Sequence, residues 1–227
     1  VFRPRKLLRI SSDAVRENVK DQIRFSSEVS FQSNIECDPV QKAWIIPAQV
    51  CYCSEAFSAV NFHHPDAPKL SLLSAALRNG YLHSAIREKG GAYGSGASNE
   101  PSTGVFRFFS YRDPNCKDTF DHFKKSIDWL DDNLSQQNLD EAVLNVIASI
   151  DKPLSPSGEA KADFYGTLNG KSHEDLIAFR DGVLNTNISD IKRVAEKYLR
   201  QDSFKSVVAG EKFDQEILDL RLEKSNT

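Results

Sequence analysis

The sequence predicts an α+β fold, with a mostly antiparallel sheet and helices packed on one face of it. Runs rich in Val, Ile, Phe and Tyr, which are typical of strands, gather mainly in residues 43–59 and 92–111. After Asp113 the apolar residues mostly recur at helical spacing, with one more strand-like run at residues 203–209. Because strand runs and helix runs come in blocks rather than in strict alternation, a parallel α/β fold is not expected.

The composition is that of a globular protein without a nucleic-acid or membrane partner. The 227 residues are 40% hydrophobic and 27% charged, with a formal net charge of -3 and a pI near 6.0. No basic stripe with interleaved aromatic residues is present, and no apolar run approaches the roughly 20 residues that span a bilayer. We expect one domain over residues 1–227, and the start at Val1 instead of Met indicates a piece of a longer protein.

The first part of the chain predicts a helix, a pair of strands and a longer helix. Residues 11–25 begin with polar N-cap candidates and continue as a helix. Residues 43–59 predict a strand pair, or one bent strand, interrupted near Pro47. Leucines then recur at nearly helical spacing, so a helix is expected over residues 68–88, with Asn79-Gly80 as a candidate break.

The second part predicts two more strands, followed by helices. Gly90-Gly91 ends the preceding helix, and aromatic residues on both faces of the second strand indicate a position inside the sheet rather than at its edge. Asn138, and either Asn187 or Ser189, are the expected N-caps of two helices. The tail, residues 213–227, is highly charged and either helical or frayed. The two strands are expected at residues 92–97 and 104–111, and the helices at 120–130, 139–150, 159–168, 176–183 and 189–199.

The densest group of special residues is residues 83–97, which read His-Ser-Ala-Ile-Arg-Glu-Lys-Gly-Gly-Ala-Tyr-Gly-Ser-Gly-Ala. Its glycines predict a tight helix-to-strand turn and a strand of little side-chain bulk, which can accept an extended peptide as an added strand. Arg87 at the helix end and Tyr93 past the turn are spaced so that both can face one spot. From the residues alone, a solvated arginine, a packed tyrosine and glycines needed only for the turn form the simpler explanation.

Other catalytic arrangements are not expected. The glycine-rich segment lacks the Gly-Lys-Ser/Thr ending of a phosphate-binding loop and runs from helix to strand, opposite to the order that places phosphate at a helix N-terminus. The five histidines form neither His-Glu-x-x-His nor His-x-x-Glu-His, so no metal ligands are expected in this chain. The four cysteines show no zinc or redox spacing and are expected to be reduced, partly buried thiols: Cys37, Cys51, Cys53 and Cys116.

Residues 82–94, Leu-His-Ser-Ala-Ile-Arg-Glu-Lys-Gly-Gly-Ala-Tyr-Gly, closely resemble the C-terminal half of the inverted-motif zinc peptidases of the pitrilysin and insulinase superfamily. Within that superfamily the presequence protease branch is the most similar. The upstream segment His64-Pro65-Asp66 and residues 109–115, Phe-Ser-Tyr-Arg-Asp-Pro-Asn, resemble the same branch. The similarity covers most of the chain and is strongest over residues 63–154.

The resemblance implies that this chain is the last of four α+β domains, which close in two halves around a chamber. It implies that zinc is bound by the missing N-terminal half, so this chain alone is expected to be inactive. It gives Tyr93 a role at the scissile carbonyl oxygen and Arg87 a role on the substrate backbone. The implied catalytic residues are Tyr93 and Arg87, and the implied substrate-binding residues are Arg87, Gly90, Gly91, Ala92, Tyr93 and Gly94.

The partners implied by this resemblance are the N-terminal half of the same polypeptide and unstructured peptides such as cleaved targeting sequences. A bacterial or organellar matrix is the expected compartment. Two alternatives stay open. One is a non-catalytic peptide-binding or structural subunit of the same superfamily. The other is an unrelated α+β interaction module, in which Arg87 and Tyr93 would point away from any shared cleft.

Overall fold

The computed structural model describes residues 40–225, so the helix predicted over residues 11–25 and Cys37 lie outside the described residues. The described residues fall into two compact units. The larger unit holds residues 40–151 and 173–225, and the smaller one holds residues 152–172.

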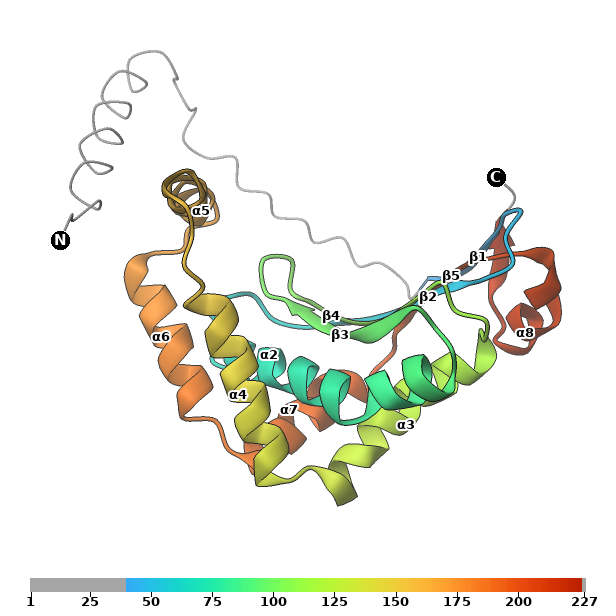
Figure 1. The fold of residues 1–227 in the computed structure, drawn as a ribbon, viewed down its shortest axis with the longest axis horizontal. Helices are drawn as coiled ribbons and strands as arrows, with labels where there is room; N and C mark the ends of the chain where they lie inside the picture. Colours follow the sequence, from blue (N-terminus) through green and yellow to red (C-terminus); the bar gives the residue numbers. More distant parts are fainter. Residues whose placement is uncertain (1–39, 226–227) are drawn as a thin grey trace, which may run out of the picture. The chain divides into compact units, whose positions relative to one another are not determined.

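The larger unit is built on a six-stranded mixed sheet with the order β3-β4-β2-β5-β1-β6 (Figure 1). Strand β1 pairs in parallel with β5 and β6, and the other neighbours are antiparallel. The strand pair predicted at residues 43–59 exists as β1 and β2, but β5 lies between them. Strand β4 lies inside the sheet, as predicted. The strands are β1 (Gln41–Ile45), β2 (Tyr52–Ser58), β3 (Gly94–Glu100), β4 (Val105–Tyr111), β5 (Phe204–Ala209) and β6 (Glu223–Ser225).

The main helices of the larger unit lie on one side of this sheet (Figure 1), which confirms the predicted α+β class. None of the helices in residues 40–225 is long and apolar enough to cross a lipid bilayer. The helices of this unit are α2 (Ala67–Leu77), the π-helix η1 (Arg78–Lys89), α3 (Lys117–Asn133), α4 (Gln136–Ile150), α6 (His173–Leu184), α7 (Ile188–Leu199), the 3-10 helix η2 (Glu211–Phe213) and α8 (Asp214–Asp219).

The helix predicted over residues 68–88 changes its winding midway. It is α-helical to Leu77 and continues as the π-helix η1. Leu77 and Leu82 are both fully buried, and the backbone hydrogen bonds of a π-helix join residues five apart, where those of an α-helix join residues four apart. Gly80 does not break the helix, since η1 runs through it. A Cβ atom at this position would lie 2.3 Å from the ring of Trp129 on α3. Glycine at this position therefore permits a close approach of η1 and α3.

The core fills the space between the helices and one face of the sheet. Phe106 and Phe108 of β4 are fully buried, and the ring of Phe108 stacks on that of Phe123 on α3, with centroids 5.3 Å apart. The apolar stripe predicted on residues 120–130 is buried, as expected from its spacing. This packing fixes β4, and with it the neighbouring edge strand β3, against the helical layer.

The N-caps of the helices and the structure of the C-terminal tail can now be compared with the prediction. Ser135, not Asn138, is the N-cap of α4, because Asn138 occupies the third helical position and its side chain accepts from the Ser135 backbone N–H in a capping box. Asn187 caps α7. The charged tail forms α8 and β6 over residues 214–225. The smaller unit contains α5 (Pro156–Leu168), capped by Ser155.

Candidate functional site

The segment that joins η1 to β3 is a tight turn built on glycine. Gly91 has a φ of 81°, in the left-handed region that favours glycine. The Gly91 N–H donates to the carbonyl of Arg87 and the Ala92 N–H donates to that of Ile86, each at 3.1 Å. These bonds close the last turn of the helix, and the chain then enters the sheet directly after Tyr93.

An open pocket of about 590 Å³ lies beside this turn, and we call it the Tyr93 pocket. The side chain of Tyr93 is 67% exposed, and its ring meets the ring of Tyr111 edge-to-face at a centroid distance of 5.9 Å. Arg87 lines the same pocket, so the structure brings the two residues implicated by the sequence to one site. The pocket is lined by Val50, Arg87, Glu88, Gly91, Ala92, Tyr93 and Arg112.

Arg87 is held only weakly by its neighbours. Its Nη1 lies 3.4 Å from Nε2 of His83, and Nδ1 of His83 lies 3.5 Å from a carboxylate oxygen of Glu88. A neutral imidazole protonated at Nδ1 satisfies both contacts, since Nε2 then accepts from the guanidinium. Within residues 40–225 Arg87 forms no ion pair with a carboxylate, so its charge is free to meet a ligand.

Arg112 is a second guanidinium at this pocket, and the sequence reasoning assigned it no role. Its Cζ lies 6.0 Å from the centroid of the Tyr93 ring, and its carbonyl accepts from the Tyr93 N–H at 3.3 Å. Its φ of 50° is left-handed, a conformation that costs a non-glycine residue about 1–2 kcal/mol. Strained backbone of this kind is concentrated at functional sites. The only sequence signal was its place inside the segment of resemblance that ends at Asn115.

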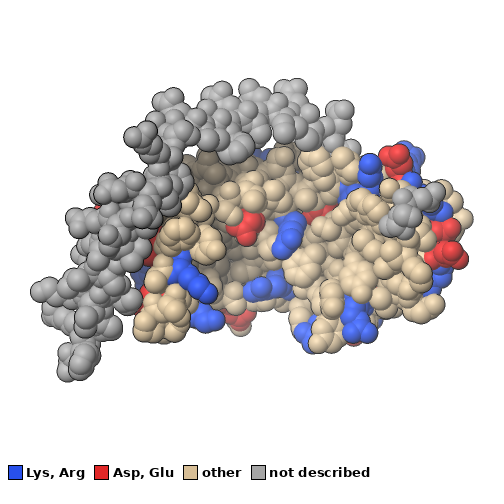
Figure 2. Space-filling view, turned by 90° about the horizontal axis from the view of Figure 1, so that it is seen from above, with Lys and Arg blue, Asp and Glu red and all other residues tan. Residues whose placement is uncertain are grey.

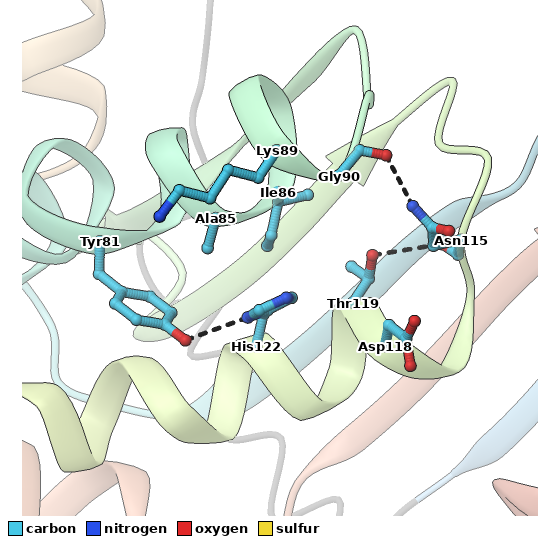
Figure 3. A pocket seen from close by; sticks show the side chains of 9 residues that line it. All are labelled: Tyr81, Ala85, Ile86, Lys89, Gly90, Asn115, Asp118, Thr119 and His122. Atoms are coloured by element: carbon cyan, nitrogen blue, oxygen red, sulfur yellow. Dashed lines mark hydrogen bonds between the residues drawn. The ribbon is translucent and has the colours of Figure 1, made fainter.

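Gly90 lines a second cavity of about 420 Å³, which lies between η1 and α3 (Figure 3). There Nδ2 of Asn115 donates to the Gly90 carbonyl at 2.7 Å, which anchors the turn that carries Tyr93. Across the cavity the Tyr81 hydroxyl lies 3.0 Å from Nδ1 of His122. Burial, and to a lesser degree Lys125, lowers the pKa of His122, which favours the neutral ring.

Asp113 fixes the loop beneath the pocket. Its backbone exchanges two hydrogen bonds with Cys51, at 2.8 and 2.9 Å, and its side chain is fully buried. The carboxyl accepts from the Thr119 hydroxyl at 2.7 Å and from the Asn115 N–H at 2.9 Å. Burial nevertheless raises the pKa of this carboxyl. The side chains on either side of Asp113 are therefore held in defined places.

The predicted binding residues do not all share one site. Gly90 lines the second cavity, and Gly94 begins β3 and pairs with Tyr111 of β4. The remaining four predicted residues, Arg87, Gly91, Ala92 and Tyr93, line the Tyr93 pocket. Strand β3 is an edge of the sheet among the described strands, and the free side of an edge strand can pair with an extended peptide.

The charged side chains of the described residues are mixed in sign on the face that Figure 2 shows. On the face in Figure 2, the visible Lys and Arg side chains of the described residues are interspersed with Asp and Glu. A nucleic-acid-binding surface would gather basic side chains on one face. The described residues visible on this face therefore do not form the basic patch that such a surface requires.

The fold is that of the M16 peptidase domains. A protease from Helicobacter pylori superposes with a TM-score of 0.62 at 22% sequence identity, over 76% of this chain and 44% of that protein. The peptidase M16 inactive domain from Pseudomonas fluorescens superposes with a TM-score of 0.60 at 19% identity, over 77% of this chain and 45% of that one. Two structures at such low identity define the architecture of the chain, and sequence similarity is needed to place it in a family.

That similarity is extensive. The sequence matches the PreP C-terminal domain family over residues 41–211. It is 41% identical to the mitochondrial presequence protease of Emericella nidulans over 179 residues, and 39% identical to that of Saccharomyces cerevisiae over 166 residues. The chain therefore belongs to the PreP C-terminal domain family, as the resemblance predicted. These matches cover 78% and 72% of the chain, but only 17% and 16% of the two relatives' lengths.

Proposed function

We propose that the Tyr93 pocket and the edge of β3 form the substrate-facing part of a zinc metalloendopeptidase that degrades unstructured peptides, such as cleaved targeting sequences. The chain corresponds to the C-terminal part of presequence proteases, and in this proposal it is the fourth domain of such an enzyme. The compartment would then be a bacterial or organellar matrix. The observation that carries the proposal is the pairing of an exposed tyrosine with two arginines in one open pocket.

The inverted zinc motif is absent from the sequence, and none of the residues that line the Tyr93 pocket is a histidine or cysteine. A catalytic zinc ion would therefore be bound by the N-terminal half of the same polypeptide. When bound, such an ion supplies Lewis-acid chemistry at a peptide carbonyl. The residues of this chain would have to bind the peptide, orient it and stabilise charge, and in this proposal the chain alone is inactive.

Tyr93 would stabilise the charge that develops on the scissile carbonyl oxygen. A phenol hydroxyl donates one hydrogen bond, and that bond strengthens as the oxygen becomes negative, so it favours the transition state over the bound substrate. Arg87 and Arg112 would hold backbone carbonyls of the peptide through guanidinium N–H groups. A peptide strand along β3 would bring its scissile bond toward Tyr93, because Tyr93 directly precedes that strand.

Replacement of Tyr93 by Phe in the full-length enzyme tests the proposal. Turnover of an unstructured peptide should fall by roughly 10- to 1000-fold, the range for loss of an oxyanion donor, while KM changes little. The control is Tyr111→Phe, because Tyr111 keeps its ring against Tyr93 but does not line the pocket. Unchanged turnover in Tyr93→Phe would remove Tyr93 from the mechanism.

A second candidate is a non-catalytic peptide-binding subunit of the same superfamily. It is favoured by the structural similarity to an M16 domain described as inactive. The two candidates separate in the unmodified full-length protein. A catalytic role requires peptide hydrolysis that a metal chelator abolishes, whereas a binding subunit would retain the peptide without cleaving it.

A further inference from the structure

Three cysteines that are scattered in the sequence meet in the core of the larger unit. Cys51 forms an isolated bridge with Asp113, Cys53 lies in β2, and Cys116 is the N-cap residue of α3. Their Sγ atoms all lie within 4.8 Å of one another, and those of Cys51 and Cys53 are 3.6 Å apart. All three are reduced and buried, with exposed fractions of 0%, 2% and 0%. They are reduced thiols, as predicted, but they are fully rather than partly buried, and nothing in the sequence indicated that they lie together.

The spacing of the sulfur atoms matches a single shared metal ion. At a typical zinc–sulfur bond length of about 2.3 Å, three sulfurs placed symmetrically around one ion are roughly 4 Å apart. Here all three sulfurs lie within 4.8 Å of one another, and those of Cys51 and Cys53 are 3.6 Å apart. Side-chain shifts of less than about 1 Å would thus close the three sulfurs around an ion.

The donor set indicates which ions suit the site. Thiolate sulfur selects soft ions such as Cu⁺ and Zn²⁺ over Mg²⁺ and Ca²⁺. Structural zinc is almost always four-coordinate, but in the described residues no fourth His, Cys, Asp or Glu joins this cluster. A three-sulfur site therefore favours Cu⁺, which is satisfied by fewer ligands. Asp113, whose carboxyl is buried, is paired with Cys51 in the isolated bridge, so a cation at the cysteines would also favour the ionised form of that carboxyl.

We propose that Cys51, Cys53 and Cys116 form a binding site for a single thiophilic metal ion, with Cu⁺ bound in preference to Zn²⁺. This proposal does not depend on the proposed peptidase function. The bound ion would cross-link β2 to the start of α3. Val50 and Arg112 line the Tyr93 pocket and directly precede Cys51 and Asp113, so the same cross-link would stiffen the floor of that pocket.

The test uses the full chain with Cys37→Ser, so that the three clustered thiols are the only ones left. Under anaerobic reducing conditions this chain is titrated separately with Cu⁺ and with Zn²⁺, against a chromophoric competitor. We expect one Cu⁺ per chain, tighter binding of Cu⁺ than of Zn²⁺, a thiolate-to-metal charge-transfer band and a higher thermal midpoint. Cys53→Ser or Cys116→Ser in this background should weaken Cu⁺ binding by at least about 100-fold, beyond the effect of losing an outer-shell partner.

Circular dichroism of each serine variant establishes that it is folded, and Cys53→Ala replaces Cys53→Ser if the hydroxyl disturbs the core. The proposal is overturned if the chain with all three thiols retains no Cu⁺. It is overturned equally if folded variants bind as tightly as the parent, or if Zn²⁺ binds more tightly than Cu⁺.

Discussion

Two groups of polar residues in the larger unit differ in how far their charged side chains are paired within the protein. The first, the Asp66 cluster, lies where α2 begins, and Asp66 is only 5% exposed. One carboxylate oxygen of Asp66 accepts from Arg193 at 2.7 Å. The other accepts from Lys197 at 3.2 Å and from the Tyr198 hydroxyl at 2.8 Å. Burial would raise the pKa of Asp66, but these three donors from α7 outweigh it and hold the pKa well below its usual range.

The second group, the Tyr93 pocket, is left open. Tyr93 is mostly exposed, Arg87 has one long contact to His83, and Arg112 is held in a left-handed backbone conformation. Within residues 40–225 neither arginine has a carboxylate partner. A charged side chain that is paired within the fold stabilises that fold, whereas an arginine without a carboxylate partner beside an open pocket is available to a ligand.

The sequence did not separate these two groups, because His64-Pro65-Asp66 and residues 109–115 carried the same resemblance. In the structure, Asp66 joins α2 to α7, and Arg112 faces a pocket. The predictions below test whether one group serves stability and the other serves substrate binding.

Among the variants that test this contrast, Arg87→Ala in the full-length enzyme is expected to have the largest effect. Loss of charge-assisted hydrogen bonds worth about 1.5–3 kcal/mol should lower kcat/KM for an unstructured peptide by roughly 10- to 100-fold. The unfolding free energy should change little, because the side chain is exposed. Lys89→Ala is the matched control, since Lys89 is on the same turn but lines the other cavity. Equal losses in both variants would mean that the effect comes from overall charge and not from the pocket.

Asp66→Asn should have the opposite signature. We expect the unfolding free energy to fall by about 1–3 kcal/mol, because hydrogen bonds to a charged group are lost. The loss is limited because Arg193 and Lys197 are about half exposed, so water replaces part of their interaction with Asp66. The kcat per folded molecule should stay unchanged. Asp128→Asn is the control, since it removes an exposed partner of Arg200 and should cost less than about 1 kcal/mol. Equal stability of the two variants in urea unfolding would contradict a special role for the Asp66 cluster.

The same variant predicts a pH dependence. The pKa of Asp66 is lowered in the folded state. Between the folded and the unfolded pKa, the native chain therefore binds fewer protons than the unfolded chain. The stabilisation from Asp66 is thus fully present above the unfolded pKa of about 3.9. It is lost as the pH falls below that value toward the folded pKa. The stability difference between the parent chain and Asp66→Asn should therefore be largest near neutral pH and shrink below about pH 4. A difference that stays constant from neutral to strongly acidic pH would remove Asp66 as its source.

Much of the fold was accessible from sequence because its signals are local. The apolar stripe of α3 and the Asn187 cap of α7 are set by residues within a few positions of one another. The π-helix was missed because the apolar pattern of residues 68–88 was interpreted with the 3.6-residue repeat of an α-helix. The insertion of β5 between β1 and β2 depends on pairing between residues about 150 or more positions apart, which no local pattern encodes.

The residues of the candidate site also divide into those with a local sequence signal and those placed by long-range pairing. Residues 87–93 form one continuous turn, so their motif and glycine content are legible in the sequence. Arg112 enters the pocket from the end of β4, and the cysteine cluster joins positions 65 residues apart. Both depend on the β2–β4 pairing and on the bridge between Cys51 and Asp113. Their roles could be found only once that sheet order was known.

The smallest expected effect is a difference in stability between two variants of Arg112, which separates backbone strain from function. Both Arg112→Gly and Arg112→Ala remove the guanidinium, so kcat/KM in the full-length enzyme should fall equally in the two variants. Their stabilities should differ, because only glycine adopts a φ of 50° without the cost of a Cβ atom. We expect Arg112→Gly to be more stable than Arg112→Ala by about 1 kcal/mol in urea unfolding.

Arg221 supplies the matched control. It also has a left-handed backbone, with a φ of 58°, but it does not line the Tyr93 pocket. Arg221→Gly and Arg221→Ala should repeat the stability difference of about 1 kcal/mol without any change in kcat/KM. If Arg112→Gly and Arg112→Ala are equally stable while the Arg221 pair differs, the loop at Arg112 relaxes freely. Its left-handed conformation would then be no sign of a strained site, and the contrast with the Asp66 cluster would rest on the open pocket alone.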